Sequence, residues 1–151
     1  MNLGPWKTQD FDTLSWHDIH VHGFRFASFD EEEGAADIVF DIDYILKWDK
    51  FGDKYIFSVC PAELTFHKAF RLKMEVDYLT PTAGMCPWAI ETIDRVPLEF
   101  ATGFKSYRWS ISINWPRGSF QFESPEFTLE LRGKPVLRSD QWLSSEDRAF
   151  K

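Results

Sequence analysis

The sequence predicts an all-β protein: a single-domain antiparallel β-sandwich or barrel of about 8–10 strands with a short C-terminal helix. Apolar and polar residues alternate with a period of two in segment after segment, which is typical of half-buried strands. Turn-forming residues separate these segments. The chain has 151 residues, of which 44% are hydrophobic and 17% aromatic, enough for one core and too few for two domains.

Two segments show the alternation most clearly. In 70–78, FRLKMEVDY, Leu72, Met74 and Val76 fall on one face and charged residues on the other. In 105–115, KSYRWSISINW, aromatic and β-branched residues alternate with Ser, Arg and Asn. Further strands are expected at 16–29, 36–48, 54–60, 62–68, 88–96, 119–124 and 126–132.

The turns between these strands can also be predicted. EEEG at 31–34 and DKFGDK at 49–54 connect the early strands. WPRG at 115–118 suits a four-residue hairpin loop with proline in a type I turn, which pairs Ile113 with Phe120 and Ile111 with Phe122. The apolar parity changes after Pro125, so we expect a bulge there. The expected core of this hairpin comprises Trp109, Ile111, Ile113, Phe120 and Phe122.

Three further segments complete the domain, 1–151. Residues 1–13 are expected to form an N-terminal arm and 80–88 a long loop. Near the C-terminus, Ser144 suits a helix N-cap, with Asp147 three residues later. Cys60 and Cys86 have no C-x-x-C spacing, and we expect both thiols to be reduced.

Composition argues against several classes of function. The net charge of −7, without a Lys/Arg run, predicts no binding to nucleic acid or to anionic membranes. The first residues resemble no signal peptide, and no stretch of about 18 apolar residues occurs. We therefore expect a cytoplasmic protein.

The segment WHDIHVHGF, 16–24, holds three of the four histidines. Pairing it with the next strand allows two registers. One places Phe24 opposite Ile42 and Arg25 opposite Asp41. The other is slipped by one residue and places Phe24 opposite Asp41. We favour the first, because a slip by one would expose a whole apolar face.

In the favoured register, His20 and His22 share the face of Phe24 and of Tyr44 on the next strand, and point inward near one end of the fold. His17 lies on the opposite face. Asp43 also faces away from His20 and His22, and His67 is expected to face outward.

Two interpretations of His20 and His22 follow. They could be two ligands of zinc or another divalent transition metal, but a third donor is then needed and Tyr44 suits zinc poorly. The preferred interpretation is a pair of partly buried structural histidines, hydrogen-bonded to the backbone or to Tyr44.

Two other pairs of ionisable residues are weaker candidates for an acid–base site. His17 and Asp18 are adjacent in sequence and should point to opposite faces of a strand. Asp41 and Asp43 share a face, which we interpret as a solvated charged surface. No G-x-S-x-G, H-E-x-x-H or phosphate-binding loop occurs.

The blocks SWHDIHVHGF, DIDYILKW, LTFH and SYRWSISINW resemble a family of small uncharacterised bacterial all-β proteins, from about Leu14 to Gln141. That family carries no catalytic role to transfer. A looser likeness, in the W-H-D motif before a β-meander, is to immunity-type proteins of polymorphic toxin systems. Such proteins need only a complementary surface.

The sequence therefore predicts a non-enzymatic binding protein, of which an immunity-type protein is one form, without identifying its partner or its oligomeric state. The first alternative is a metal- or histidine-dependent enzyme with its site near His20 and His22. The second is a barrel that binds a small ligand near His20, His22, Tyr44 and Trp109.

Overall fold

The alternating segments form β-strands in the computed structural model, which describes residues 2–79 and 84–148. One antiparallel sheet of nine strands makes up most of the described chain, and a short helix follows near the C-terminus, as predicted. The elements are β1 (Trp6–Lys7), the 3₁₀ helix η1 (Thr8–Thr13), β2 (His20–Asp30), β3 (Ala35–Phe51), β4 (Lys54–Asp77), β5 (Trp88–Glu99), β6 (Lys105–Trp115), β7 (Arg117–Ser124), β8 (Glu126–Leu131), β9 (Val136–Arg138) and α1 (Ser145–Arg148).

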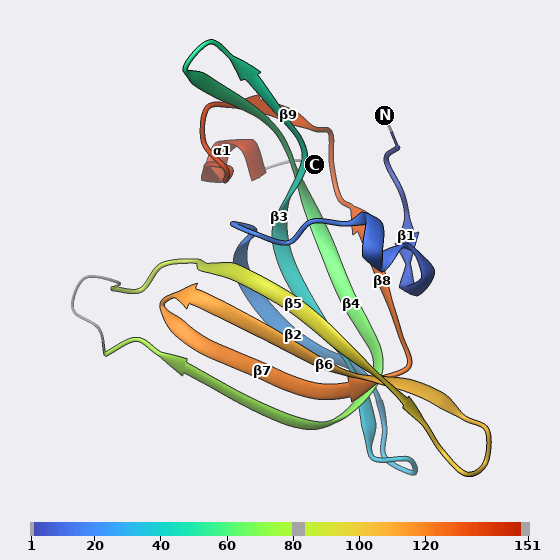
Figure 1. Cartoon of the computed structure of the whole chain (residues 1–151). Helices are drawn as coiled ribbons and strands as arrows, with labels where there is room; N and C mark the ends of the chain where they lie inside the picture. Colours follow the sequence, from blue (N-terminus) through green and yellow to red (C-terminus); the bar gives the residue numbers. More distant parts are fainter. Residues whose placement is uncertain (1, 80–83, 149–151) are drawn as a thin grey trace.

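The strand order closes on itself. The path runs β1-β8-β4-β3-β2-β5-β6-β7, and β7 also pairs with β4, so that six strands form a ring. The link between β2 and β5 is short, only His20 with Ala89 and Val21 with Trp88. Figure 1 shows β5, β6 and β7 lying across β2, β3 and the first half of β4.

β4 joins the two halves of the fold because it bends. Residues 54–69 pair with β3, and residues 70–77 pair with β7. Lys68 and Arg71 have positive φ angles of 50° and 55° at this bend. The amide of Lys68 donates a hydrogen bond to Asp37 at 3.1 Å, which fixes the turn of the strand. We expected separate strands at 54–60, 62–68 and 70–78, but β4 is continuous through Pro61.

The core is built largely of aromatic rings. Trp109 is fully buried, and its ring lies 5.0 Å from that of Phe66 and 5.6 Å from that of Phe127. The indole N–H donates to the Ser124 carbonyl at 2.9 Å, so this buried polar group is satisfied. All five residues predicted to form the hairpin core are buried: Trp109, Ile111, Ile113, Phe120 and Phe122.

The register of that hairpin differs from the prediction. Ile111 pairs with Phe120, and Ile113 with Gly118, two residues away from the expected partners. The strands extend to Asn114 opposite Arg117, which leaves a two-residue connection instead of a four-residue loop. A shift of two residues keeps the same side chains on the same face, and the core prediction is unaffected.

Residues 2–13 and 136–148 contain more regular structure than the sequence predicted. The 1–13 arm contains β1, which pairs with β8, and Trp6 of β1 is buried in the core. The strand β9, which pairs with β4, was not predicted. The C-terminal helix is confirmed: the Ser144 hydroxyl accepts a hydrogen bond from the Asp147 amide at 3.2 Å, as an N-cap does.

Two other expectations can be compared with the structure. Cys60 and Cys86 are both free thiols, as predicted, and Cys60 is buried. Among the described residues, no helix has the length and apolar character needed to cross a membrane. Part of the expected 80–88 loop, residues 80–83, lies outside the described residues.

Candidate functional site

The register between β2 and β3 differs from the one predicted. Phe24 pairs with Phe40, not Ile42, and Arg25 pairs with Val39, not Asp41. β2 contains two irregularities, one between Ala27 and Asp30 and one between Val21 and Gly23. Each places one extra residue in β2, which the sequence alone did not reveal.

The second bulge, at His22, changes which residues face inward. Val21 is buried in the core, and Phe24, three residues later, also packs against the core. In a regular strand these two side chains would point to opposite faces, so the bulge reverses the alternation between them. The prediction that His20 and His22 share the inner face of Phe24 is therefore wrong. The prediction that Asp43 faces away from the histidines is also wrong, because the bulge brings His22 beside Asp43.

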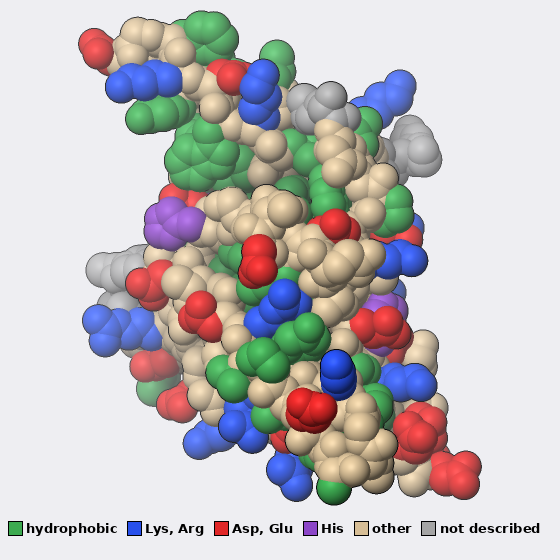
Figure 2. All heavy atoms as spheres, turned by 45° about the vertical axis from the view of Figure 1, so that its right-hand side comes forward, with side chains coloured by type: hydrophobic (Ala, Val, Ile, Leu, Met, Phe, Trp, Pro, Cys, Tyr) green, Lys and Arg blue, Asp and Glu red, His purple; other side chains and the backbone are tan. Residues whose placement is uncertain are grey.

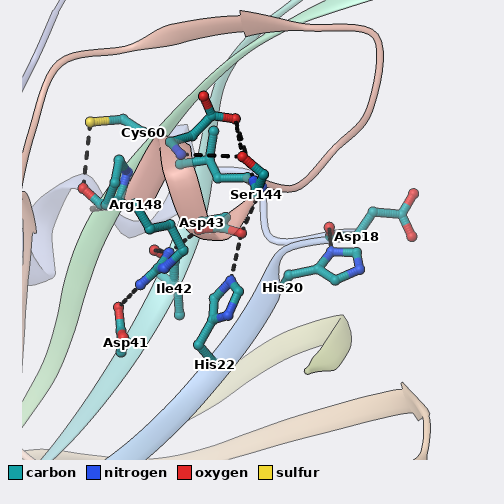
Figure 3. A network of polar contacts seen from close by, with 12 residues as sticks. Asp18, His20, His22, Asp41, Ile42, Asp43, Cys60, Ser144 and Arg148 are labelled. Carbon is teal, nitrogen blue, oxygen red and sulfur yellow. Dashed lines mark hydrogen bonds and ion pairs between the residues drawn. The ribbon is translucent and has the colours of Figure 1, made fainter. Parts of the chain in front are cut away.

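Asp43 is the centre of a polar cluster on the outer side of β3. Its carboxylate is completely buried, with His22 Nε2 2.7 Å from Oδ2. The Leu143 amide donates to the same oxygen at 3.0 Å, and Arg148 binds Oδ1. The second guanidinium nitrogen of Arg148 binds Asp41, as Figure 3 shows. Asp41 and Asp43 do share a face, but Asp43 is buried instead of solvated.

The C-terminal segment 141–148 covers this cluster. Gln141 Nε2 donates to the Asp18 carboxylate at 2.8 Å, and the side chain of Leu143 is buried. Trp142 lies over His20, with ring centroids 5.0 Å apart. The cluster therefore joins residues more than 100 positions apart in the chain, such as Asp43 and Arg148.

His20 lies at the edge of this cover. Its Nδ1 is 3.2 Å from the Asp18 carbonyl oxygen, in agreement with the predicted hydrogen bond to the backbone. Burial under Trp142 and neighbouring residues lowers the pKa of His20 below its usual 6.5, because desolvation disfavours the charged imidazole. His20 is therefore held neutral by its surroundings near neutral pH.

The other two predicted site residues lie in the packed interior, away from these histidine contacts. Tyr44 is buried between Trp6 and Trp16, with ring centroids 5.7 and 5.8 Å away. Burial raises the pKa of Tyr44 to about 12. Trp109 lies in the core described above. The structure thus does not bring His20, His22, Tyr44 and Trp109 together around one open cavity.

His22 also borders a surface cavity. The cavity has a volume of about 300 Å³ and is lined in part by Tyr78, Cys86 and Trp88. The side chain of His22 is 23% exposed, so it connects buried Asp43 with this cavity. No hydrogen bond joins His22 and Cys86 in the described part of the chain.

Metal ligation has little geometric support. In residues 2–79 and 84–148, no three His, Cys, Asp or Glu side chains are grouped closely enough to hold a metal ion. His67 faces outward as expected, because it alternates with buried Phe66, and its ring lies 3.3 Å from Asp37 and 3.0 Å from Thr128. His17 and Asp18 do approach, at 3.4 Å, on the exposed surface.

A larger groove lies beside the polar cluster, on the outer face of β2, β3 and β4. Its volume is about 620 Å³. Gly23 lies in its wall, where an added Cβ would meet nothing within 4 Å. The residues that line it are Gly23, Phe24, Arg25, Val39, Asp41, Pro61, Glu63, Arg132 and Arg148.

The charges in this groove are loosely paired. Glu63 is 3.7 Å from Arg25 and 3.2 Å from Arg132. The two arginine side chains are 59% and 47% exposed, so their ion pairs exchange readily with water. Arg148, in contrast, is only 15% exposed and is held by Asp41 and Asp43. Sequence analysis missed this groove because its residues come from five separate segments.

The fold and the groove define a class: an all-β single domain with a charged groove on the outside of its sheet. This chain matches no known protein-family model. It also has no significant match among curated proteins.

Proposed function

We propose that this protein acts without catalysis, by binding a partner protein through the charged groove. The observation that carries the proposal is the pair of half-exposed arginines, Arg25 and Arg132, that share Glu63 in the groove. Arginine is enriched at protein interfaces, because its planar guanidinium forms paired hydrogen bonds with carboxylates. A partner's Asp or Glu would replace Glu63 or water beside these groups.

The surroundings of the groove support recognition over chemistry. Strands β2, β3 and β4 form its floor, and Arg148 is anchored at its rim by two carboxylates. A rigid, preformed surface loses little conformational entropy on binding. Figure 2 shows basic and acidic side chains interspersed over one face of the molecule. The groove also mixes the two signs, with Arg25 and Arg132 beside Asp41 and Glu63, which favours a partner with a matching pattern of charges over one of a single sign.

Site-specific photo-crosslinking tests this proposal. A photoreactive residue at position 130, beside Arg132, should give a discrete protein adduct in cells, while one at exposed position 105 should not. Arg25→Glu combined with Arg132→Glu should abolish the adduct without unfolding the protein. Equal labelling from both positions, or an adduct unaffected by the arginine changes, would refute the proposal.

An immunity-type role is a narrower form of the same proposal, supported by the W-H-D resemblance alone. The partner would then be a toxin, and the groove would bind an acidic part of its surface. Expression of a toxin encoded beside this protein should stop growth of the host cell, and co-expression of this protein should restore it. Arg25→Glu with Arg132→Glu should remove the protection, and protection by that variant would refute a role for the groove.

A histidine-dependent enzyme is the second candidate, favoured by the 2.7 Å contact of His22 with buried Asp43 beside an open cavity. A carboxylate that orients a histidine is a feature of many general bases. Turnover of any substrate that disappears with His22→Gln, but persists in the Arg25→Glu variant, would favour this candidate. Toxin protection or crosslinking retained by His22→Gln would count against it.

A further inference from the structure

The second half of β4 has an unpaired edge. Residues 62–67 of β4 pair with β3 on one edge and with β8 on the other. Residues 70–77 pair with β7, which lies on the same edge of β4 as β8. On the opposite edge, the pairing with β3 ends at Ala69. Among the described residues, no strand occupies the other edge of 70–77. In Figure 1 this half of β4 is the outermost strand at the lower margin. Open strand edges are templates for pairing with another chain.

The charges along this edge have a regular order. Arg71, Lys73, Glu75 and Asp77 alternate with apolar residues, and all four are exposed. Within the described chain, Lys73 and Glu75 form no ion pair, and Arg71 only reaches Glu123 at 3.4 Å with 73% of its side chain exposed. Two basic residues are therefore followed by two acidic residues along one open strand edge.

We propose that this edge pairs with the same edge of a second copy of the chain, in an antiparallel two-fold dimer centred on Met74. In an antiparallel pair centred on Met74, Lys73 of each copy faces Glu75 of the other. The strand is irregular between Phe70 and Lys73, where Arg71 has a positive φ, so the regular part of this pair begins at Lys73. Opposite charges directly across a strand pair are stabilising, and a two-fold axis forms each pair twice.

The charge order selects this register over its neighbours. Centring the pair on Glu75 would place Glu75 opposite itself, and centring it on Lys73 would place Lys73 opposite itself. A parallel pair in register would put every charge opposite its own kind. Like charges directly opposite are destabilising, so of these registers the Met74-centred antiparallel one alone places Lys73 opposite Glu75.

The apolar face of the edge is consistent with the same register. Leu72 and Val76 pack against the core, and they would face each other across the two-fold axis. Met74 is 46% exposed, although it lies on the same face. Pairing with a second copy places Met74 beside its symmetry mate and covers this side chain, whose flexibility suits a self-complementary contact.

The dimer is expected to be weak and reversible. It joins one short strand from each copy, and such small interfaces are typical of transient complexes. Its ion pairs are exposed, so added salt should weaken them. The charged groove lies on the outer face of β2 and β3, and dimer formation leaves it open to a partner.

Sedimentation equilibrium on the full chain tests the dimer. The wild type should show a concentration-dependent monomer–dimer equilibrium. Lys73→Glu alone, and Glu75→Lys alone, should each raise the dimer Kd by about tenfold or more, because each places like charges across the axis twice. The double swap Lys73→Glu with Glu75→Lys should return the Kd to near its wild-type value.

Mixing the two single variants gives a sharper readout. A heterodimer of Lys73→Glu with Glu75→Lys places opposite charges at both positions, so the equimolar mixture should dimerise while each variant alone does not. Lys134→Glu changes the net charge by the same amount as Lys73→Glu, but at an exposed residue away from this edge. It should leave the dimer Kd unchanged.

Each outcome decides the proposal. A wild-type chain that stays monomeric at the highest attainable concentration overturns the dimer. A dimer that Lys73→Glu leaves intact, or that neither the double swap nor the mixture restores, overturns this edge and register. Circular dichroism of each variant distinguishes lost association from lost folding.

Discussion

Replacing Asp43 with alanine should strongly destabilise the protein. The carboxylate is completely buried and receives hydrogen bonds from the Leu143 amide at 3.0 Å and from Arg148, while His22 lies 2.7 Å away. Removing it leaves the buried Leu143 amide unsatisfied, which costs about 1–3 kcal/mol. It also leaves Arg148 with one carboxylate instead of two.

These effects do not add fully. Arg148 keeps its contact with Asp41, and the side chain of His22 is 23% exposed and can turn to water. Breaking a buried ion pair by removing one partner costs about 3–5 kcal/mol, and we expect Asp43→Ala to fall in this range. The Asp41 side chain is 55% exposed, so Asp41→Ala should cost no more than about 1 kcal/mol.

Urea unfolding followed by tryptophan fluorescence measures the free energy of unfolding of the Asp43→Ala and Asp41→Ala variants. A double-mutant cycle with Arg148→Ala should give a coupling energy for Asp43 in the range of about 0.5–3 kcal/mol. Hydrogen exchange at the Leu143 amide should also accelerate in Asp43→Ala. A loss of stability below about 1 kcal/mol, or one equal to that of Asp41→Ala, would show that the cluster does not hold the C-terminal segment.

Three other predictions concern stability. Trp109→Ala should cost about 3–5 kcal/mol, because it empties a fully buried ring; a urea titration giving a cost below about 1 kcal/mol would contradict the core. Acidification should destabilise the protein as pH falls below about 6.5, because the lowered pKa of His20 lets the unfolded state bind the proton first. His20→Gln should flatten that part of the stability–pH curve. An unchanged curve would show that His20 does not cause the loss of stability at low pH. Gly118→Ala should cost about 1–3 kcal/mol, because the added Cβ would lie 2.2 Å from the Glu75 carbonyl oxygen. Gly23→Ala, where an added Cβ meets nothing within 4 Å, should cost less, and urea titrations of both variants measure the difference.

The sequence predicted the fold class well because period-two alternation depends only on which face of a strand is buried. The buried face of β6 and β7 was correct even though their register was wrong by two residues. A shift of two preserves the face, so the alternation determines burial without determining the strand partner. Pro61 was taken as a strand break, yet β4 passes through it, and Pro61 lies opposite Asp43 of β3.

The candidate site could not be predicted from the same pattern. A bulge adds one residue to a strand and reverses the parity beyond it, and His22 carries no special sequence signal for one. The partners of Asp43 lie at residues 22, 143 and 148, so no local spacing connects them. The capping pair Ser144 and Asp147 was predictable, because an N-cap is a local interaction.

The bulge at His22 links stability to the proposed binding surface. The extra residue moves His22 beside Asp43, and Asp43 in turn anchors the C-terminal segment that carries Arg148 into the rim of the groove. Arg25 lies on the same groove, but its side chain is exposed and pairs only with Glu63, so changing it should alter binding with little effect on folding. Changing Asp43 should weaken folding and binding together. Measuring both properties in the two variants therefore separates recognition by the groove from the support beneath it.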